Sequence, residues 1–407
     1  MTEGDTRRLR VLIGAYACGP GEGSEPGAGW AFVRAAAEHS DVWVVTRRRF
    51  EPAIRAALDD EPDLAAHVHV RYLDLSDRVL RAKRRHRDVY WYYVLWQRAL
   101  AGLAAELHAT VSFDVAHHVT FASDWQPCGL TTLSDVPLVW GPVGGATYQP
   151  TRLLRWLGWR GVLAETARSC FTRVARRVWG DPIARRAAVV VALNTDVARR
   201  FAYARRVVVE PNIALYDDFP QRTATPRDDG SRRQAVFVGR LLPWKGPQLA
   251  IRALARPGGE RWDLALYGEG PYEPALRALV GELGLGSRVS FEGHAPRSDV
   301  LAALAAADAL LFPSMHDSAG WVVGEASAVG CPVVCLDVGG PPLLADRNGL
   351  VCPIDGDVVG GLAHALDAST TFESGPTDRW SAERLPAMTA RWYADACGRS
   401  ARASTST

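Results

Sequence analysis

The 407-residue sequence predicts two α/β domains, each built on a parallel sheet with helices on both of its faces. Short apolar runs rich in β-branched residues alternate with helical patterns along the whole chain, and strands this apolar are typical of parallel sheets that are covered on both sides. The length exceeds one ordinary core. A stretch without periodicity, rich in Pro, Asp, Thr and Arg, interrupts the alternation at 213–233 and predicts a linker there.

The strands can be assigned in chain order. Those of the first domain are expected at 8–16, 41–47, 67–75, 136–145, 187–194 and 205–212, and the segment "DVAHHVTF" at 114–121 contains one more. Those of the second domain are expected at 234–241, 262–270, 288–293, 309–314 and 331–340. The predicted organisation is a first domain at 1–212, the linker, a second domain at 234–378, a C-terminal helix at 379–400 that packs back on the first domain, and a disordered tail at 401–407. We expect a ligand to bind in a cleft between two doubly wound domains, where strand ends gather.

Composition narrows the class of protein. Hydrophobic residues make up 48% and charged residues 23% of the chain, and the net charge of +2 implies no general affinity for nucleic acid. Seven cysteines without a CxxC pair indicate neither a disulfide framework nor a zinc site. With no signal peptide and no apolar run near 20 residues, the sequence suggests a cytoplasmic protein.

Positive charge is concentrated in the first part of the chain. Residues 1–212 carry 29 Lys/Arg and 22 Asp/Glu, against 18 and 23 in the remainder. Residues 78–96, "RVLRAKRRHRDVYWYYVLW", combine basic and aromatic side chains. One interpretation is a helix at a membrane surface or acceptor site. The other, which the contiguous aromatics favour, is a helix whose rings pack on the sheet while its arginines are solvated.

The first strand runs into a glycine-rich loop, "ACGPGEGSEPGAGW", at 17–30. Small residues between a strand and a helix allow the backbone to approach a phosphate. The spacing is not GxGxxG, and the next strand ends in Thr46 and Arg47 without an acidic ribose ligand, so a dinucleotide dehydrogenase is disfavoured. The alternative is a surface loop.

The second domain opens with "FVGRLLPWKG", in which Gly239 and Arg240 end a strand and Lys245 precedes a helix. A guanidinium and an ammonium group beside a helix N-terminus predict a site for a dianion. A solvated lysine at a helix start is the simpler alternative.

The segment "HDSAGWVVGEASAVGCPVVC" at 316–335 places Asp317 and Glu325 around a helix start at Gly320 and Trp321. The helix N-terminus supplies N–H donors for an anion, whereas carboxylates repel phosphate and suit hydroxyl groups. A metal site is the rival interpretation. Asp355 and Asp357 in "DGD" offer one, but one of them more simply caps a helix.

Two adjacent histidines, His117 and His118, are expected to end a strand within "DVAHHVTF". Their side chains point to opposite faces of the sheet, so at most one faces the cleft. His118 is the candidate, although a lone histidine is more often structural.

The motifs "GRLLPWKG", "LYGEGP", "FEGHAPRSDV" and "FPSMHDSAGWVVGEASAVGCPVV", with the glycine loop, "HHVTF" and "VWGPVGG", resemble the retaining GT-B glycosyltransferases of family 4. The resemblance is strongest at 236–352. It implies that Arg240 and Lys245 hold a donor diphosphate, that Glu325 binds the ribose and that Asp317, in place of the usual Glu, reads the sugar with His118. It assigns to donor binding Gly21, Gly23, Gly239, Gly268, His294, Ser318, Ala319, Gly320 and Trp321, and to acceptor binding Glu25, His117, Gly144 and Gly145.

The resemblance therefore implies a retaining, metal-independent transfer of a sugar from a UDP- or GDP-sugar to a separate acceptor, with no cofactor. The acceptor class stays open: a small metabolite, a glycan or a lipid, with oxygen, nitrogen or sulfur as nucleophile. Two alternatives are a nucleotide-sugar epimerase on the same fold and a catalytically silent sugar-nucleotide-binding subunit. Turnover of the donor without an acceptor distinguishes the epimerase.

Overall fold

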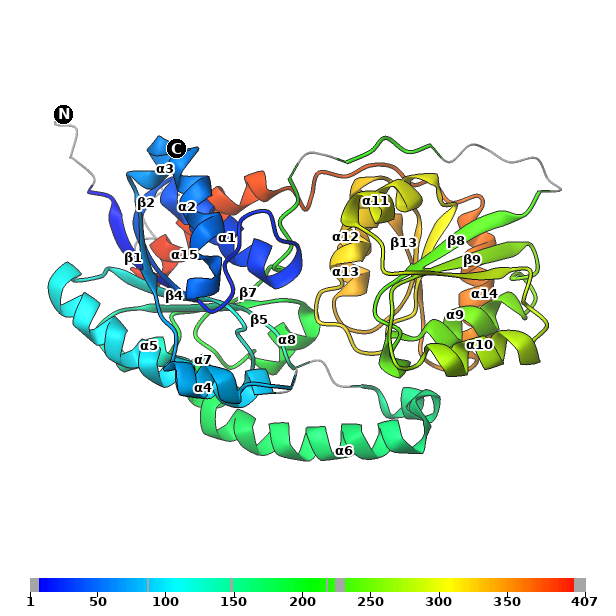
Figure 1. Ribbon diagram of the computed structural model, residues 1–407, viewed down its shortest axis with the longest axis horizontal. Coiled ribbons are helices and arrows are strands. Elements are labelled where there is room, and N and C mark those ends of the chain that lie inside the picture. The colour runs from blue at the N-terminus through cyan, green and yellow to red at the C-terminus, as the bar shows by residue number, and fades with distance from the viewer. Residues whose placement is uncertain (1–6, 86–87, 147–148, 217–218, 224–230, 399–407) are drawn as a thin grey trace, which may run out of the picture. The chain divides into compact units, whose positions relative to one another are not determined.

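The computed structural model describes residues 7–85, 88–146, 149–216, 219–223 and 231–398. It contains two compact units (Figure 1). The first consists of residues 1–146, 171–214 and 382–407, and the second of 147–170 and 215–381. Part of the expected linker and the expected tail at 401–407 lie outside the described residues.

The first unit is built on a seven-stranded sheet in the order β3-β2-β1-β4-β5-β6-β7, and all its strand pairs are parallel. The strands lie close to the expected ranges: β1 Leu9–Ala15, β2 Ser40–Thr46, β3 Val68–Tyr72, β4 Val115–Thr120, β5 Leu138–Val143, β6 Val189–Ala192 and β7 Val207–Val209.

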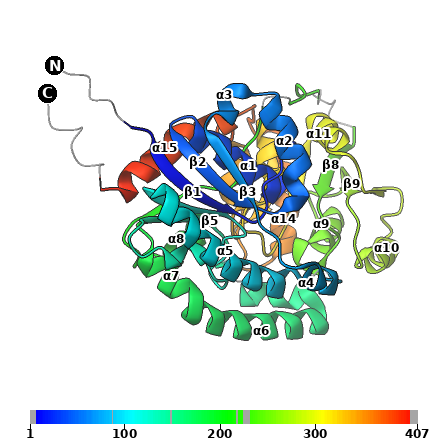
Figure 2. The ribbon, with the colours of Figure 1, turned by 60° about the vertical axis from the view of Figure 1, so that its left-hand side comes forward.

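Helices cover both faces of this sheet (Figure 2). On one face the core contains residues of α1 (Ser24–Ala37), α2 (Glu51–Asp59) and α15 (Leu385–Ala396). On the other it contains residues of α5 (Val89–Val111), α7 (Asp181–Arg186) and α8 (Thr195–Arg200). The short helices α3 (Pro62–Ala65) and α4 (Asp77–Ala82) complete the unit. Apolar strands with two covered faces explain why the sequence shows continuous apolar runs and little alternation.

The second unit contains a six-stranded parallel sheet in the order β10-β9-β8-β11-β12-β13. Its strands are β8 Arg233–Val238, β9 Trp262–Tyr267, β10 Val289–Gly293, β11 Ala309–Phe312, β12 Val333–Leu336 and β13 Gly349–Cys352. The last of them was not predicted. Its helices are α9 Pro247–Leu254, α10 Glu273–Glu282, α11 Arg297–Ala306, α12 Trp321–Ala328, α13 Pro341–Ala345 and α14 Val358–Ser369.

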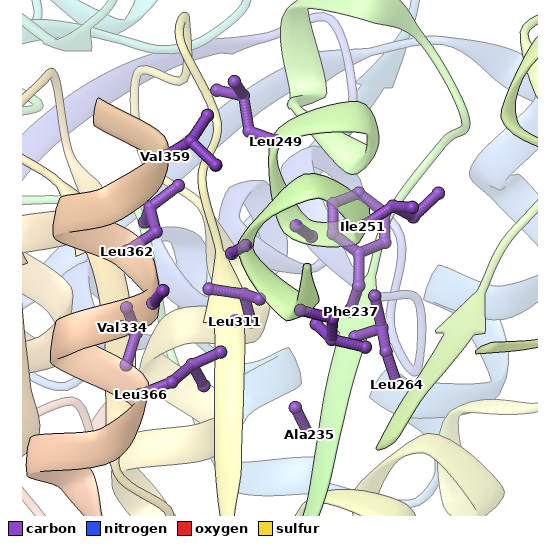
Figure 3. Packing of buried hydrophobic residues seen from close by; sticks show 14 of the residues in the cluster. Ala235, Phe237, Leu249, Ile251, Leu264, Leu311, Val334, Val359, Leu362 and Leu366 are labelled. Atoms are coloured by element: carbon purple, nitrogen blue, oxygen red, sulfur yellow. The ribbon is translucent and has the colours of Figure 1, made fainter. Parts of the chain in front are cut away.

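The core of the second unit lies between its sheet and helices α9, α10 and α14. Figure 3 shows Phe237 and Leu311 of the sheet packed with Leu249 of α9 and Leu362 of α14. Asp357 caps α14, since its carboxylate accepts the Gly360 N–H at 3.1 Å. The capping interpretation of the "DGD" segment is thus confirmed.

The units and the expected domains divide the chain differently, most clearly at residues 147–170. Residues 147–170, expected in the first domain, belong to the second unit, where Leu153 and Leu157 enter the core. The helix α6 (Gly158–Ala175) therefore begins in one unit and ends in the other. Within the described residues, no helix combines the length and apolar content needed to cross a bilayer.

Candidate functional site

The second sheet has its topological switch point between β8 and β11, because the chain continues from β8 to one side and reaches β11 on the other. The loops that follow these strands lie in contact. The Met315 N–H donates to the Trp244 carbonyl at 2.8 Å. Gly246 has φ of 78°, and a Cβ there would lie 2.1 Å from the Pro313 carbonyl oxygen. Only glycine therefore allows these two loops to approach so closely.

The two loops carry three of the predicted charged residues and bring two of them, Lys245 and Asp317, into contact. Lys245 Nζ lies 2.5 Å from Asp317 Oδ2 and 5.8 Å from the Phe312 ring centre. Arg240 is exposed and has no ion-pair partner among the described residues. The site thus holds one cation in a charge-assisted hydrogen bond and one cation open to solvent.

A pocket of about 320 Å³ opens beside Arg240 in the same unit. Four predicted donor-binding residues line it together: Gly239, Arg240, Gly268 and His294. Gly268 has φ of 130°, and a Cβ there would lie 2.1 Å from the Gly239 carbonyl oxygen. The shape of this pocket therefore depends on two glycines whose backbones touch.

The loop before α12 is held by a neighbouring loop. The Gly340 N–H donates to the Asp317 carbonyl at 3.0 Å, and a Cβ at Gly340 would lie 2.3 Å from the Ser318 carbonyl oxygen. Gly320 has φ of 84° and ψ of 59° and precedes the first residue of the helix, Trp321. The strand–loop–helix arrangement places the start of α12 close to Asp317 in the chain.

Glu325, inside α12, is buried, and its Oε1 accepts a hydrogen bond from Arg297 Nε at 2.8 Å. Arg297 is the first residue of α11 and its guanidinium also lies 5.9 Å from the Phe219 ring centre. Arg297 was not predicted as a partner of the carboxylate, although it lies in the segment "FEGHAPRSDV". Its position at a helix start after a strand was the available signal.

The first sheet has its own switch point between β1 and β4, and Glu25 lies beside it. Glu25 Oε1 accepts the Phe121 N–H at 2.5 Å and Oε2 accepts from Asn212 Nδ2 at 3.0 Å. Burial raises the pKa of Glu25, and these two hydrogen bonds oppose that rise. Both oxygens thus bind groups of the protein itself. Asn212 was not among the predicted residues.

Gly21 and Gly23 lie in the loop between β1 and α1. Gly21 has φ of 72°, Gly23 immediately precedes α1, and a Cβ at either would meet no atom within 4 Å. Both glycines therefore lie in an open part of the loop, and Gly21 also has the left-handed conformation that favours glycine.

The two histidines lie in the middle of β4, and their side chains are buried on opposite faces of the sheet. His117 Nε2 donates to the Gly141 carbonyl at 2.9 Å, and its Nδ1 accepts from the Tyr393 hydroxyl at 2.9 Å. His118 Nε2 lies 2.8 Å from the Tyr93 hydroxyl. The expectation that they close the strand is wrong, because β4 continues to Thr120. Inside this unit neither imidazole reaches the surface, which favours a packing role.

Gly144 and Gly145 follow β5 in the chain, and Gly144 is hydrogen-bonded to the loop that follows β4. Gly144 N–H donates to the Ala122 carbonyl at 2.9 Å. Gly145 has φ of 91°, and its carbonyl accepts from Arg176, whose guanidinium also pairs with buried Asp124. Neither Asp124 nor Arg176 was predicted. Both glycines thus contribute to the backbone of this loop.

Comparison with known proteins finds sequence similarity mainly in the second unit. Residues 220–358 match the family model described as "Glycosyl transferases group 1". A D-inositol 3-phosphate glycosyltransferase of Mycobacterium sp. (strain JLS) is 33% identical over 201 residues, which cover 42% of this chain and 45% of the relative. The same-named protein of Mycobacterium tuberculosis (strain F11) is 38% identical over 151 residues, or 36% of this chain and 31% of the relative. The chain thus spans less than half of these curated relatives.

Solved structures extend the similarity over both units. Anabaena HepE in complex with UDP superposes with a TM-score of 0.55 at 17% identity, over 94% of this chain and 98% of the other. Sucrose-phosphate synthase of Thermosynechococcus elongatus gives 0.57 at 18% identity, over 96% and 97%. Two Rossmann-like units with these neighbours define the architecture. The chain has the GT-B fold, and it resembles the glycosyltransferases of family 4.

Proposed function

We propose that this protein is a retaining glycosyltransferase that moves a sugar from a nucleoside-diphosphate sugar to a separate acceptor. The observation that carries the proposal is the arrangement at the β8–β11 switch point. There, Lys245, Arg240 and Asp317 follow the carboxyl ends of adjacent strands, beside a pocket rich in glycine. Cations at such a crevice suit a diphosphate.

In this proposal Arg240 and Lys245 bind the donor diphosphate. The diphosphate competes with Asp317 for Lys245, because the ammonium group lies 2.5 Å from that carboxylate. The N–H groups at the start of α12 add neutral donors for the same anion. Asp317 then faces sugar hydroxyls, while buried Glu325, oriented by Arg297, accepts hydrogen bonds from the ribose.

Retention requires no covalent nucleophile when the leaving diphosphate stays on the face that the acceptor attacks. The acceptor oxygen, nitrogen or sulfur forms the new bond to the anomeric carbon, the bond to the diphosphate breaks, and a phosphate oxygen takes the acceptor proton. The protein must stabilise the charge that develops on the leaving group. Two cations and a helix N-terminus supply that stabilisation without a divalent metal.

The names of similar proteins suggest where to begin. One solved structure similar in fold contains UDP and glucose, and the curated relatives are named for D-inositol 3-phosphate. UDP- and GDP-sugars are therefore the first donors to test, and phosphorylated polyols the first acceptors.

The experiment is a panel of nucleotide sugars in a thermal-shift assay, followed by product analysis with each stabilising donor. A donor at 100 times its Kd should stabilise the folded chain by about 2.7 kcal/mol. Product with retained anomeric configuration, formed equally with and without EDTA, is expected. Inversion, or activity that EDTA abolishes and Mn²⁺ restores, contradicts the proposal. Conversion of a donor without any acceptor supports the epimerase instead.

A further inference from the structure

Among the exposed large apolar side chains of the first unit, six lie in two segments of the chain. Phe171, Val174 and Val178, at the end of α6 and in the π-helical turn that follows, are 61%, 63% and 57% exposed. The others, on the first turns of α5, are Tyr90, Trp91 and Leu95. Side chains of this size are normally buried, and a group of them marks an interaction surface.

The two groups are joined through Trp125. Its ring centre lies 5.2 Å from that of Tyr90 on α5 and 6.0 Å from that of Phe171 on α6. The spacing of Phe171, Val174 and Val178 places them on one side of a helical turn. The opposite side is used inside the protein, because Thr172, Ala175 and Arg176 are buried. The outward apolar side is thus not explained by packing within the unit.

Arginines accompany these apolar side chains. Six of them are exposed and form no ion pair with any described residue: Arg78, Arg81, Arg84, Arg85, Arg173 and Arg177. Two nearby carboxylates are already used, since Asp88 accepts the backbone N–H groups of Arg84 and Arg85, and Asp74 accepts from Arg47 and Tyr92. The surface is therefore basic as well as apolar. We refer to these twelve side chains as the basic-apolar surface.

We propose that the basic-apolar surface binds the surface of an anionic phospholipid bilayer. Lipid phosphates can pair with the arginines, while Trp91, Tyr90 and Phe171 suit the boundary between headgroups and acyl chains. A second copy of this chain suits the surface less well, because a two-fold contact would place arginines against arginines. The structure thereby supports both interpretations of residues 78–96 in part. Tyr92, Tyr93 and Trp96 pack inside, as favoured from the sequence, but Tyr90, Trp91 and Leu95 do not.

The test is co-sedimentation of the full chain with vesicles. One set contains phosphatidylcholine alone, and the other contains phosphatidylcholine with about one third phosphatidylglycerol. The chain should sediment with the anionic vesicles and much less with the neutral ones. Binding should weaken when salt rises from about 0.1 M to about 0.5 M, because screening shortens the reach of the arginines.

Two variants separate the contributions of charge and of apolar contact. The double variant Arg84→Ser/Arg85→Ser should lower the partition coefficient on anionic vesicles by roughly 25-fold, at about fivefold for each arginine. The double variant Phe171→Ser/Val174→Ser should lower it by about tenfold or more. The matched control is Arg55→Ser/Arg391→Ser, which removes exposed arginines from α2 and α15, on the other face of the sheet. The control should bind as the unchanged chain does.

Three outcomes overturn this proposal: no binding to anionic vesicles, equal binding to neutral vesicles, or equal losses in the control variant. A fourth is self-association in sedimentation equilibrium that the same substitutions abolish, because the surface is then a contact between copies. Circular dichroism melts establish that each variant is folded. UDP or GDP titration measures the donor site separately, so failure here leaves the proposed function untouched.

Discussion

Lys245 and Arg240 have different surroundings but the same proposed partner, the donor diphosphate. Replacing either with Ala should lower kcat/KM by roughly 10²–10³, as loss of a charged group at a leaving group typically does. Arg277→Ala is the matched control, because that arginine is exposed and its contacts, an ion pair with Glu273 and the Phe291 ring 4.2 Å away, lie outside the proposed site. Steady-state kinetics check the expectation. Near-normal rates in either variant would remove that residue from the site.

Asp317 and Glu325 are expected to divide their roles between sugar and ribose. Asp317→Asn should impair transfer more than binding of the free nucleoside diphosphate, whereas Glu325→Gln should weaken that binding about tenfold or more, because a charge-assisted hydrogen bond is lost. Calorimetric titration of UDP and GDP against both variants measures this, with Glu273→Gln as control. If Asp317→Asn loses as much affinity as Glu325→Gln, the division is wrong. A metal role for the pair is then tested by repeating the titration with divalent ions.

His117 and His118 make the stability of the first unit depend on pH. Burial lowers the pKa of His117 to about 4, and burial with the neighbouring His117 lowers that of His118 to about 3, from 6.5. Between the ordinary pKa of 6.5 and these lowered values, the unfolded chain binds more protons than the folded chain. The stability from neutral imidazoles is therefore complete above pH 6.5 and is lost as the pH falls toward 4 and 3.

Denaturant midpoints measured across this pH range check the effect. His118→Gln should flatten the loss of stability between pH 6.5 and 3 and leave UDP or GDP affinity unchanged, since the imidazole is buried against Tyr93. An unchanged pH slope contradicts the assignment. A large fall in kcat/KM with normal stability and a normal nucleotide affinity would indicate instead that His118 contacts the sugar, as the family resemblance implied.

At the scale of elements, two glycines of the second unit should respond to alanine in opposite ways. Gly268→Ala should destabilise the unit by roughly 1–3 kcal/mol and weaken nucleotide binding, because its backbone is left-handed and its Cβ would meet the Gly239 carbonyl at 2.1 Å. Gly281→Ala, in α10, should stabilise by about 1 kcal/mol, since no atom lies within 4 Å of its Cβ. Denaturation and UDP or GDP titration of both variants check this. Equal effects would mean that backbone conformation does not shape the pocket.

The sequence predicted elements well wherever the signal was local. Apolar β-branched runs located every strand but β13, whose four residues include the exposed Val351 and resemble a loop. Gly239, Gly268 and Gly320, which the family resemblance named, were recognisable from the sequence as glycines beside a strand end or helix start, and each has positive φ. Burial of His118 and the partnership of Glu325 with Arg297 were not, since both depend on elements distant in sequence. The same holds for residues 147–170, whose helical pattern does not identify the unit on which they pack.

On the scale of the whole molecule, the chain has separate cores that should unfold separately. The core clusters of the first unit and the cluster of the second share no residues. Two-state unfolding is therefore not expected, and calorimetry should resolve two transitions. Gly268→Ala identifies the transition of the second unit, and His118→Gln identifies that of the first.

The proposed donor contacts of Arg240, Lys245, Asp317 and Glu325 all lie in the second unit. A nucleoside diphosphate that binds only the folded form of this unit stabilises it by RT ln(1 + [L]/Kd), or about 2.7 kcal/mol at 100 times Kd. Adding UDP or GDP should therefore raise the midpoint of the transition that Gly268→Ala lowers and leave the other in place. In the Lys245→Ala variant the same concentration should raise it less. If the ligand raises instead the transition that His118→Gln identifies, the nucleotide binds the first unit, and the donor site has been assigned to the wrong half of the chain.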